Sequence, residues 1–474
     1  MKEEVFFFEK KKQKTFVCLV LAIILTGCAV GPNFAPPPPP KTLAAAPAMQ
    51  NITQQWWELF GSATLDQAIQ TGLAHSPNLA SEQAALRAAQ AQYRATAGAL
   101  YPQISGNLNA TRESTPFGAQ TLTESISQAG ITMNYALDIW GGNRRNAEEQ
   151  AANVDDARFI LADTRITLAS NIAQTMITIA SLRDQIEATH QILAAEQQSR
   201  DLINQQLSLG SKTRADLLQQ DAQIAQTRST LPPLAQQLDR AGHLLAALSG
   251  LEAAATATPG IQLADLSLPH DLPSALPANL IEQRPDIMEQ QALLHARTAA
   301  LGVATANMLP AITLSANDTL LNETVAGITE NGINLWSLGA GLTQPLFEGG
   351  TLRALRAEAR AQLDEQAATY QQTVMSALQN VADSLTASQH DRDAVAADAA
   401  YETAAQASLD FTRAQYQIGA TDFTTLLTQE VTYQQARLTH IQAVAAQYQD
   451  AVLLYQSLGG GWWAQPQAAL GAKS

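Results

Sequence analysis

Residues with reactive side chains are few and scattered in this sequence. Among its 474 residues are two cysteines and seven histidines, and no histidine is spaced with Cys or Glu as metal ligands are. No Gly-x-Ser-x-Gly elbow marks a nucleophile, and Gly339-Ala340-Gly341 falls in a predicted strand without the rest of a dinucleotide-binding motif. We therefore expect no enzymatic activity, no metal and no bound cofactor.

Cys28 is the exception, because its setting predicts a covalent modification. It follows a basic run and an apolar run at 16–25, which together are typical of a secretory signal. Leu25-Thr26-Gly27-Cys28 is similar to the lipobox of bacterial lipoproteins, in which the cysteine is acylated and becomes the N-terminus. Cys18 lies inside the predicted signal, 1–27, so the mature chain has no intramolecular disulfide. An ordinary signal peptide with an accidental cysteine is the alternative.

The residues after Cys28 predict where the chain goes. Ala29 stands where an aspartate would favour retention at the inner membrane, so we expect sorting to the outer membrane. Residues 28–50 are expected to be a lipid-anchored spacer, since five prolines at 36–40 favour stiff polyproline II. The net charge of −15 argues against nucleic acid as a partner. Beyond residue 27 no apolar run is long enough for a transmembrane helix.

The rest of the chain contains an internal duplication at an offset of 208 to 210 residues. The matching pairs include Leu100-Tyr101-Pro102 with Met308-Leu309-Pro310, Gly141-Gly142 with Gly349-Gly350, and Leu209-Gly210 with Ile418-Gly419. We place the first repeat at 51–250 and the second at 285–461, with a connection at 251–284 and a tail at 462–474. Each copy is therefore a domain-scale unit rather than a short solenoid repeat.

Each repeat shows the same order of predicted elements. A helix of about 24 residues ends before a proline, a β-hairpin follows, and a long helical hairpin completes the repeat. The short helices are at 77–100 and 285–308, the β-hairpins at 103–139 and 311–347, and the helical hairpins at 143–248 and 350–458. The duplication thus predicts four strands and two helical hairpins for each chain.

The strand segments alternate between apolar residues and small polar residues. Ile104, Gly106 and Leu108 alternate with Ser105 and Asn107, and the other segments follow the same rule. A half-buried soluble sheet alternates equally well, but these strands carry almost no Lys or Glu. Strands of about ten residues match the length of transmembrane β-strands. Candidate interfacial aromatics are Tyr101, Tyr135, Trp140, Trp336 and Phe347; polar loops are expected at 114–126 and 322–333.

The longest predicted helices, at about 143–208 and 350–416, have apolar residues at steps of three, four and seven. Such spacing predicts coiled-coil-like packing, and at 1.5 Å per residue each helix is about 100 Å long. Gly210 and Gly419 are expected to end them, and the chain returns at 212–248 and 421–458. Pro232-Pro233 should kink or split the first return helix. Residues 41–76, 249–284 and 459–474 are expected to gather where the shorter helices leave gaps.

Four membrane strands in one chain cannot close on themselves. An open sheet edge in lipid leaves backbone groups unpaired, at several kcal/mol each, so the chain must assemble with copies of itself. Two chains would give about eight strands and a filled interior, and three would give about twelve strands and room for a lumen.

Several longer motifs carry a resemblance to a known family. They are Leu231-Pro232-Pro233-Leu234, Gln283-Arg284-Pro285-Asp286-Ile287, Asn334-Leu335-Trp336-Ser337-Leu338-Gly339-Ala340-Gly341-Leu342, Gln344-Pro345-Leu346-Phe347-Glu348-Gly349-Gly350, and Tyr448-Gln449-Asp450 ahead of Gly459-Gly460-Gly461-Trp462-Trp463. With the lipobox and both repeats, they resemble the TolC-like outer-membrane factors in their lipoprotein, NodT-type branch. The resemblance covers nearly the whole mature chain.

The resemblance implies a fold and a function. The expected fold is a mixed α/β membrane protein: a homotrimer with a 12-stranded barrel in the outer membrane of a Gram-negative bacterium and a long helical barrel in the periplasm. Such ducts work with a periplasmic adaptor and an inner-membrane pump of the resistance-nodulation-division (RND) class, and export small toxic solutes. Protein secretion is the alternative cargo, while an adaptor or a spacer lipoprotein is disfavoured by two long hairpins and four strands.

The resemblance also points to the helical turns as working parts. It implies adaptor contacts at Gly210, Ser211, Gly419 and Ala420, and a periplasmic aperture at Tyr416, Thr421 and Asp422. Tyr416 matches a gate tyrosine of TolC, whereas acidic aperture positions of TolC fall here on Thr425 and Thr428, which departs from the pattern. Three copies of Asp422 could form a cation-attracting ring. The alternative is that Asp422 only caps the return helix, and both can hold. Asp216 is expected to be an acidic residue in the first turn of the return helix, where it interacts favourably with the helix dipole.

Overall fold

The structure is a computed structural model that describes residues 29–37, 53–118, 120–252, 258–269 and 283–462. The signal segment, Cys28, Pro38 to Pro40 and the tail from residue 463 lie outside the described residues. The elements are η1 (Trp56–Phe60), α2 (Ala63–His75), α3 (Pro77–Ala97), η2 (Gly98–Leu100), β1 (Gln103–Phe117), β2 (Gln120–Leu137), α4 (Gly142–Ser208), α5 (Arg214–Ser229), α6 (Leu231–Leu248), η4 (Leu263–Asp265), α8 (Pro285–Ala306), β3 (Ala311–Asn322), α9 (Gly327–Asn331), β4 (Ile333–Thr343), α10 (Thr351–Gln417) and α11 (Phe423–Ser457).

These elements form two compact units that do not follow the two repeats. Unit 1 contains residues up to 37, 85–158 and 289–372, and unit 2 contains 38–84, 159–288 and 373 onward. Each unit therefore combines corresponding parts of both repeats. The repeats are units of sequence and topology, but neither repeat is a compact domain.

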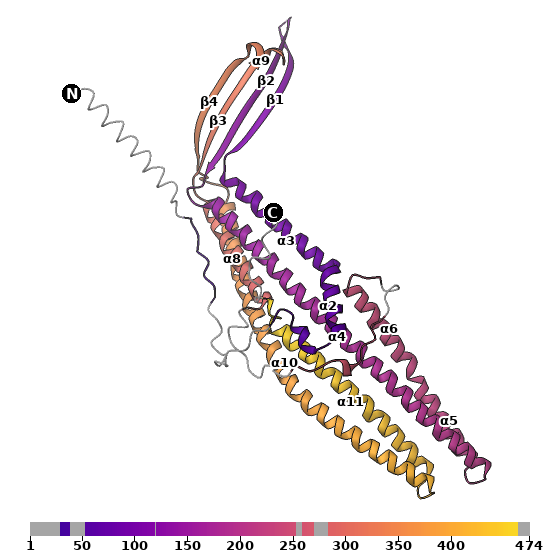
Figure 1. Ribbon diagram of the computed structural model, residues 1–474. Coiled ribbons are helices and arrows are strands. Elements are labelled where there is room, and N and C mark those ends of the chain that lie inside the picture. The colour runs from indigo at the N-terminus through magenta and orange to yellow at the C-terminus, as the bar shows by residue number, and fades with distance from the viewer. Residues whose placement is uncertain (1–28, 38–52, 119, 253–257, 270–282, 463–474) are drawn as a thin grey trace. The chain divides into compact units, whose positions relative to one another are not determined.

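Unit 1 contains one antiparallel sheet with the strand order β1-β2-β3-β4 (Figure 1). β1 pairs with β2 and β3 pairs with β4, which gives one hairpin to each repeat as expected. β2 pairs with β3, from Leu137↔Ile312 to Ser127↔Asn322, and so joins the two repeats. The outer edges of β1 and β4 have no partner strand within the part of the chain that the structure describes.

Residues paired across strands point to the same side, and toward the starts of β1 and β3 the register sets apolar rows beside polar rows across all four strands. One apolar row is Ile104, Met133, Ala316 and Leu338, and a neighbouring polar row is Ser105, Thr132, Asn317 and Ser337. The separation is incomplete further along, where Asp318 pairs with Ile131 and Trp336, and Leu321 and Ile333 fall on the polar face. Ile104 is 70% exposed and Leu338 76% exposed, so nothing in the described part of the chain covers the apolar face at these positions. A half-buried soluble sheet would cover it.

The expectation of loops at 114–126 and 322–333 is wrong for the first segment and incomplete for the second. β1 and β2 continue as a two-stranded ribbon to the pair Phe117↔Gln120, and only the turn between them remains. Thr and Ser in this segment were polar enough to suggest a loop, but Thr has a β-branched side chain that suits a strand. The second segment contains the short helix α9, beside the strand end of β3.

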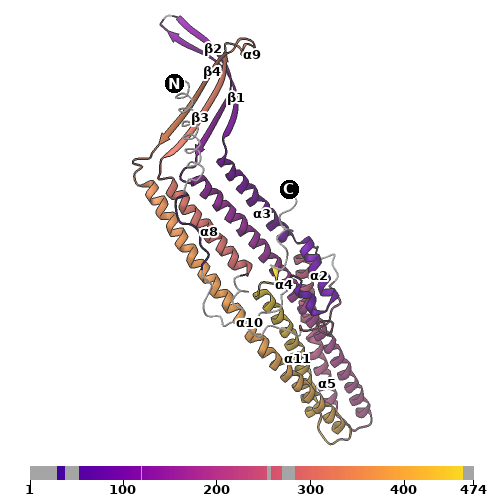
Figure 2. The same ribbon diagram turned by 60° about the vertical axis from the view of Figure 1, so that its left-hand side comes forward.

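Long helices form unit 2 and extend into unit 1. α4 and α10 each have 67 residues without a break, as the apolar spacing predicts. In unit 2, α5 runs back beside α4 and α11 beside α10 (Figures 1 and 2). The predicted apolar positions are buried in unit 2, among them Leu168, Ile172, Met176, Ile179, Leu193, Val374 and Val381. No helix in the described residues has the length and apolar character needed to cross a membrane.

The first return helix is split at the position that its prolines predict. α5 ends at Ser229 and α6 begins at Leu231, with Pro232 and Pro233 in the first turn of α6. Prolines are tolerated there because the amide hydrogens of a first turn have no partner inside the helix. The second return helix has no proline and is continuous over 35 residues in α11.

The main core of unit 2 gathers the segments that were expected to fill gaps between helices. Trp56 of η1 stacks on Tyr455 of α11 with ring centroids 5.5 Å apart. The same cluster contains Ile172 of α4, Leu263 of η4 and the fully buried Phe60. The short helices and connections are thus part of the packed core and not a loose covering of it.

Candidate functional site

The residues just after Cys28 pack against the rest of unit 1. The Val30 amide donates a hydrogen bond to the Trp140 carbonyl at 2.9 Å. Phe34 stacks on the His295 ring with centroids 4.5 Å apart. Ala29 is so close to Gly141 that a Cβ at this glycine would lie 2.7 Å from the Ala29 Cα. This N-terminal strap, residues 29–34, was expected to belong to a spacer, yet it is docked on the folded body.

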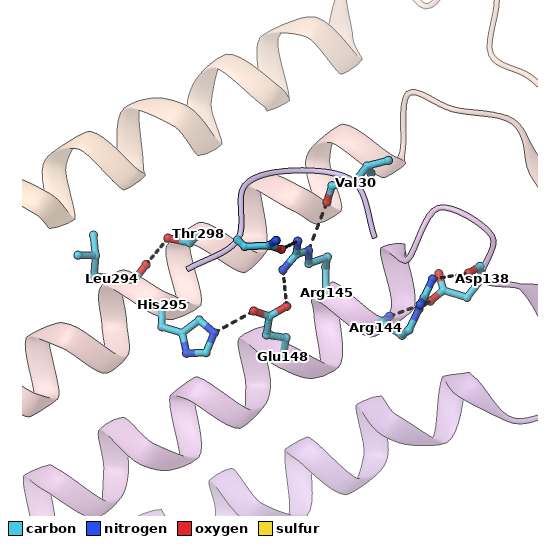
Figure 3. Close-up of polar contacts among 9 residues, drawn as sticks. Val30, Asp138, Arg144, Arg145, Glu148, Leu294, His295 and Thr298 are labelled. Atoms are coloured by element: carbon cyan, nitrogen blue, oxygen red, sulfur yellow. Dashed lines mark hydrogen bonds and ion pairs between the residues drawn. The ribbon is translucent and has the colours of Figure 1, made fainter. Parts of the chain in front are cut away.

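Arg145 lies at the centre of the contacts that hold the strap, which we call the Arg145 dock (Figure 3). Its Nε donates to the Val30 carbonyl at 3.3 Å, and its Nη2 donates to Asn33 Oδ1 at 2.6 Å. Its Nη1 forms an ion pair with Glu148 at 2.7 Å, and Glu148 also contacts His295 at 2.9 Å. The side chain of Arg145 is only 5% exposed, so its hydrogen bonds with the strap replace contacts with water.

Glu148 is kept ionised by its two neighbours. Burial raises the pKa of this carboxyl, but hydrogen bonds from His295 and Arg145 outweigh burial and leave the pKa below its ordinary value. The dock therefore combines an ion pair between Arg145 and Glu148 with the contact of Glu148 to His295. Sequence reasoning missed it, because no motif joins Arg145 to a strap 112 residues earlier.

The adaptor-contact candidates lie in two turns of matching geometry. Gly210 and Gly419 both have φ of +76°, which favours glycine. The Ser211 amide donates to the Gln206 carbonyl, and the Ala420 amide donates to the Gln415 carbonyl. These bonds define a Schellman ending at each long helix. Both turns are at the same end of unit 2 in both views (Figures 1 and 2).

Each turn also carries an exposed aliphatic residue immediately before its glycine. Leu209 is 82% exposed and Ile418 is 81% exposed. They occupy equivalent positions in the two repeats, and Gly210, Ser211, Gly419 and Ala420 beside them are exposed as well. Sequence reasoning named the glycines of these turns and passed over the two side chains with the largest apolar area, although both precede a helix-ending glycine.

The return helices begin at side-chain caps. Thr213 and Asp216 form a reciprocal capping box at α5, a closer role for Asp216 than the dipole interaction predicted. Asp422 caps α11 by accepting a hydrogen bond from the Thr425 amide at 2.7 Å, and the Thr425 hydroxyl donates to the same oxygen. These bonds, with the one from the Thr425 amide foremost, lower the pKa of Asp422. The capping role is therefore real, and the side chain is exposed and ionised.

Tyr416 belongs to the core of the turns, not to their surface. It is 3% exposed and packs against Phe423 with centroids 5.7 Å apart, while Lys212 Nζ lies 3.9 Å from its ring centroid. Its hydroxyl has no hydrogen-bond partner among the described residues. Burial, then Asp216, raises the pKa of Tyr416 to about 12. Thr421 is partly buried, so of the three aperture candidates only Asp422 is exposed.

Arg284 is a second residue whose role the sequence did not reveal beyond its place in a motif. It holds Asp286 with two hydrogen bonds, at 3.0 and 2.8 Å, and donates to the Ser457 carbonyl at 2.6 Å. Its side chain is 9% exposed. Arg284 thus fixes the start of α8 to the last residue of α11. Over the described ranges, no three His, Cys, Asp or Glu side chains come together as a metal site.

The model of the outer membrane efflux protein family matches residues 68–251 and 276–460, one range for each repeat. The pyoverdine export outer membrane protein OpmQ of Pseudomonas putida is 29% identical, over 94% of this chain and 98% of that protein. Nodulation protein T of Rhizobium leguminosarum bv. viciae is 28% identical, over 95% and 94%.

Solved structures show the same architecture. The outer-membrane channel OprN has a TM-score of 0.85 and 26% identity, covering 92% of this chain and all of that one. CusC has a TM-score of 0.83 and 26% identity, covering 91% of this chain and all of that one. A family of transport ducts, not of enzymes, thus accounts for both repeats, the sheet and the helical hairpins. The chain belongs to the outer membrane efflux protein family and is an outer-membrane efflux channel with a large periplasmic helical part.

Proposed function

We propose that three copies of the chain close into one duct. The open edges of β1 and β4 support this, because unpaired backbone groups in lipid cost several kcal/mol each. Three four-stranded sheets supply about twelve strands, enough for a water-filled lumen, whereas about eight strands enclose only side chains. The row of Ser105, Thr132, Asn317 and Ser337 suits a lumen, and the apolar row beside it suits lipid.

We further infer that Cys28 carries a covalent lipid and is the first residue of the mature chain. The lipobox supports this, and so does the docked strap, since Ala29 is held against Gly141 beside the end of β2. A lipid on the preceding residue would then enter the membrane close to the sheet. Tyr101, Trp336 and Phe347 are well exposed and could lie at the membrane interfaces. No other cofactor is expected, and no enzymatic activity.

The proposed partners are a periplasmic adaptor protein and an RND inner-membrane pump. Leu209 and Ile418 support a protein partner at the turns, because an exposed aliphatic side chain on a rigid turn gains free energy when a partner buries it. Related proteins are named for pyoverdine export, cation efflux and toluene efflux. The proposed cargo is accordingly a small toxic solute, and Asp422 is the candidate for a cation-attracting ring at the aperture.

The single observation that carries the proposal is the register of the sheet, which sets the apolar row of Ile104, Met133, Ala316 and Leu338 beside the small, uncharged row of Ser105, Thr132, Asn317 and Ser337 across all four strands. Single-channel conductance of the purified protein in a planar bilayer tests it. We expect discrete openings that are small and mostly closed. Stable incorporation of the protein without any conductance would contradict the duct.

Two glycines provide matched variants for that recording. A Cβ at Gly130 would lie 2.5 Å from Thr319 Oγ1 and 3.1 Å from the Asp318 carbonyl oxygen, whereas at Gly106 the nearest atom is 3.9 Å away. Gly130→Val should therefore disturb the β2–β3 pairing and abolish the openings, while Gly106→Val on the apolar face keeps them. Equal conductance in both variants would show that the sheet does not form the pore.

A further inference from the structure

Two buried carboxyl groups lie inside unit 2, away from the turns and the N-terminal strap. Glu196 on α4 is 2% exposed and Glu430 on α11 is 4% exposed. Both line one cavity of about 190 Å³, together with Arg413 of α10. Glu196 belongs to the helical hairpin of the first repeat and Glu430 to that of the second. The pair therefore sits at the contact between the two hairpins.

Glu196 is only partly satisfied by its neighbours. Its Oε1 accepts hydrogen bonds from Thr227 Oγ1 at 2.8 Å and from Gln223 Nε2 at 3.2 Å. Both donors are on α5, the partner of α4 in the same hairpin. Its Oε2 has no hydrogen-bond partner within the described ranges. Burial of an acceptor without a donor costs free energy, and the cost is greater for an ionised one.

The groups around Glu430 stabilise a negative charge on its carboxyl only weakly. The Ser199 hydroxyl of α4 donates to its Oε1 at 3.3 Å, and Arg413 Nη2 is 3.8 Å from the same oxygen. Arg413 is shared with Asp410, at 3.7 Å. The Oε2 of Glu430 has no partner in the part of the chain that the structure describes. One shared, distant guanidinium does not neutralise two buried carboxylates.

The charged groups around the pair come from three helices. α4 contributes Glu196 itself and α10 contributes Arg413 with Asp410. α11 contributes Tyr433 and Arg437 to the cavity, and Arg437 is engaged with Glu402 at 3.3 Å. From α5 the contacts are uncharged: Gln220, Gln223 and Thr227. Burial raises the pKa of Glu430 to about 7 and Glu196 adds to this, while Arg413 and hydrogen bonds from Ser199 and Gln220 oppose it. Burial also raises the pKa of Glu196.

We propose that Glu196 and Glu430 form a proton-binding carboxyl pair that joins the two helical hairpins. A protonated Glu430 is neutral and can donate a hydrogen bond to an unpaired oxygen, so α11 packs against α4 and α5 without a buried charge. When the proton leaves, two carboxylates face each other across the cavity, and α11 separates from α4 more readily. The pair makes hairpin contact depend on pH.

The direction of the pH dependence follows from the linkage between proton binding by Glu430 and packing of the hairpins. A separated or unfolded Glu430 ionises near its ordinary pKa of 4.5, whereas the packed form keeps its proton up to a pKa of about 7. The packed arrangement is therefore most favoured below pH 4.5 and loses stability as the pH rises toward about 7. Each unit between the two pKa values corresponds to a factor of ten in the separation equilibrium. We expect a change of about tenfold or more between pH 5 and pH 8.

Hydrogen–deuterium exchange of the purified, detergent-solubilised chain tests this without requiring any transport activity. Exchange times are corrected for the intrinsic pH dependence of amide exchange, and peptides from 424–436 and 190–203 are followed at pH 5 and pH 8. In the unsubstituted chain we expect at least tenfold less protection at pH 8. Glu430→Gln, which is neutral and of the same shape, should remove the pH dependence and retain the acid level of protection.

Two more variants make the result decisive. Glu196→Gln removes the second charge and should reduce the pH dependence, and it keeps the test open if Glu430→Gln does not fold. Glu187→Gln changes an exposed glutamate on the same helix as Glu196 and should keep the full dependence. Equal protection of the unsubstituted chain at both pH values, or an unchanged dependence in Glu430→Gln, would overturn the proposal.

If the proposed duct function holds, the same pair couples proton concentration to the aperture. Conductance should then rise between pH 5 and pH 8 in the unsubstituted chain and stay constant in Glu430→Gln. Titration of Asp422 does not contribute to this change in conductance, because hydrogen bonds from Thr425 lower the pKa of Asp422 and keep it ionised between pH 5 and pH 8. A chain that shows no conductance but still shows pH-dependent hydrogen exchange would contradict the proposed duct and support the proposed carboxyl pair.

Discussion

At the scale of single residues, Asp422 has one observed role and one proposed role, and a single substitution can separate them. Its carboxylate caps α11 and its exposed charge is the candidate for an aperture ring. Asparagine caps helices as well as aspartate does but carries no charge. Asp422→Asn should therefore lower the cation preference of the channel, measured as the reversal potential in a salt gradient, with assembly unchanged.

Asp422→Ala is the matched control, because it removes the cap as well as the charge. Faster hydrogen exchange of the amides at 423–426 is expected in the alanine variant only. Unchanged ion selectivity in both variants would leave Asp422 with the capping role alone.

The Arg145 dock gives a second prediction at this scale. Arg145→Ala removes the hydrogen bonds to Val30 and Asn33 and leaves Glu148 with one partner fewer. We expect a loss of about 2 kcal/mol in stability and a mobile strap. A nitroxide attached through Ala35→Cys, at an exposed position, reads strap mobility from its spectrum. Arg144→Ala, which removes a more exposed arginine paired with Asp138, should leave the spectrum unchanged.

The same label measures the pH dependence of the dock. The lowered pKa of Glu148 means that its contribution is present above its ordinary pKa of 4.5 and is lost as the pH falls through the folded value. The strap should stay immobile at neutral pH and become mobile in acid below pH 4.5. If the label in the chain that retains Arg145 is as mobile at pH 7 as it is in acid, the strap is not docked.

At the scale of elements, the long helices could be read from the sequence and the strand ends could not. Apolar residues recur over all of α4 and α10, so many positions support the same period. Pro232-Pro233 identified the break between α5 and α6 for a local reason, the lack of an amide hydrogen. The ends of β1 and β2 depend on pairing between strands, and Ser- and Thr-rich sequence suits a loop or a strand equally.

The two turns make a prediction about partner binding. Leu209→Asp and Ile418→Asp place a charge on side chains that are already exposed, so thermal stability should change little. If an adaptor buries these residues, each substitution should weaken its binding by tenfold or more. Binding is measured by surface plasmon resonance with a purified periplasmic adaptor protein of an RND efflux system. Unaffected binding in the double variant would remove the turns from the interface.

At the scale of the whole molecule, the duplication was visible in the sequence, and the division into compact units was not. Each unit draws on both repeats because elements of one copy pack against elements of the other, as β2 and β3 do. Contacts between distant segments also explain why the Arg145 dock, the Arg284 junction and the Glu196–Glu430 pair escaped sequence reasoning. Each depends on hydrogen bonds between segments far apart in the sequence: 112 residues for Arg145 and Asn33, 173 for Arg284 and Ser457, and 231 for Ser199 and Glu430.

In the proposed duct, the four-stranded sheet closes with copies of itself. The most direct test is the mass of the purified protein in detergent, measured by native mass spectrometry. We expect a trimer, because three sheets of the order β1-β2-β3-β4 pair every open edge around a lumen. A monomer with an intact sheet would contradict the proposed duct, and so would a dimer, whose interior leaves no room for a solute.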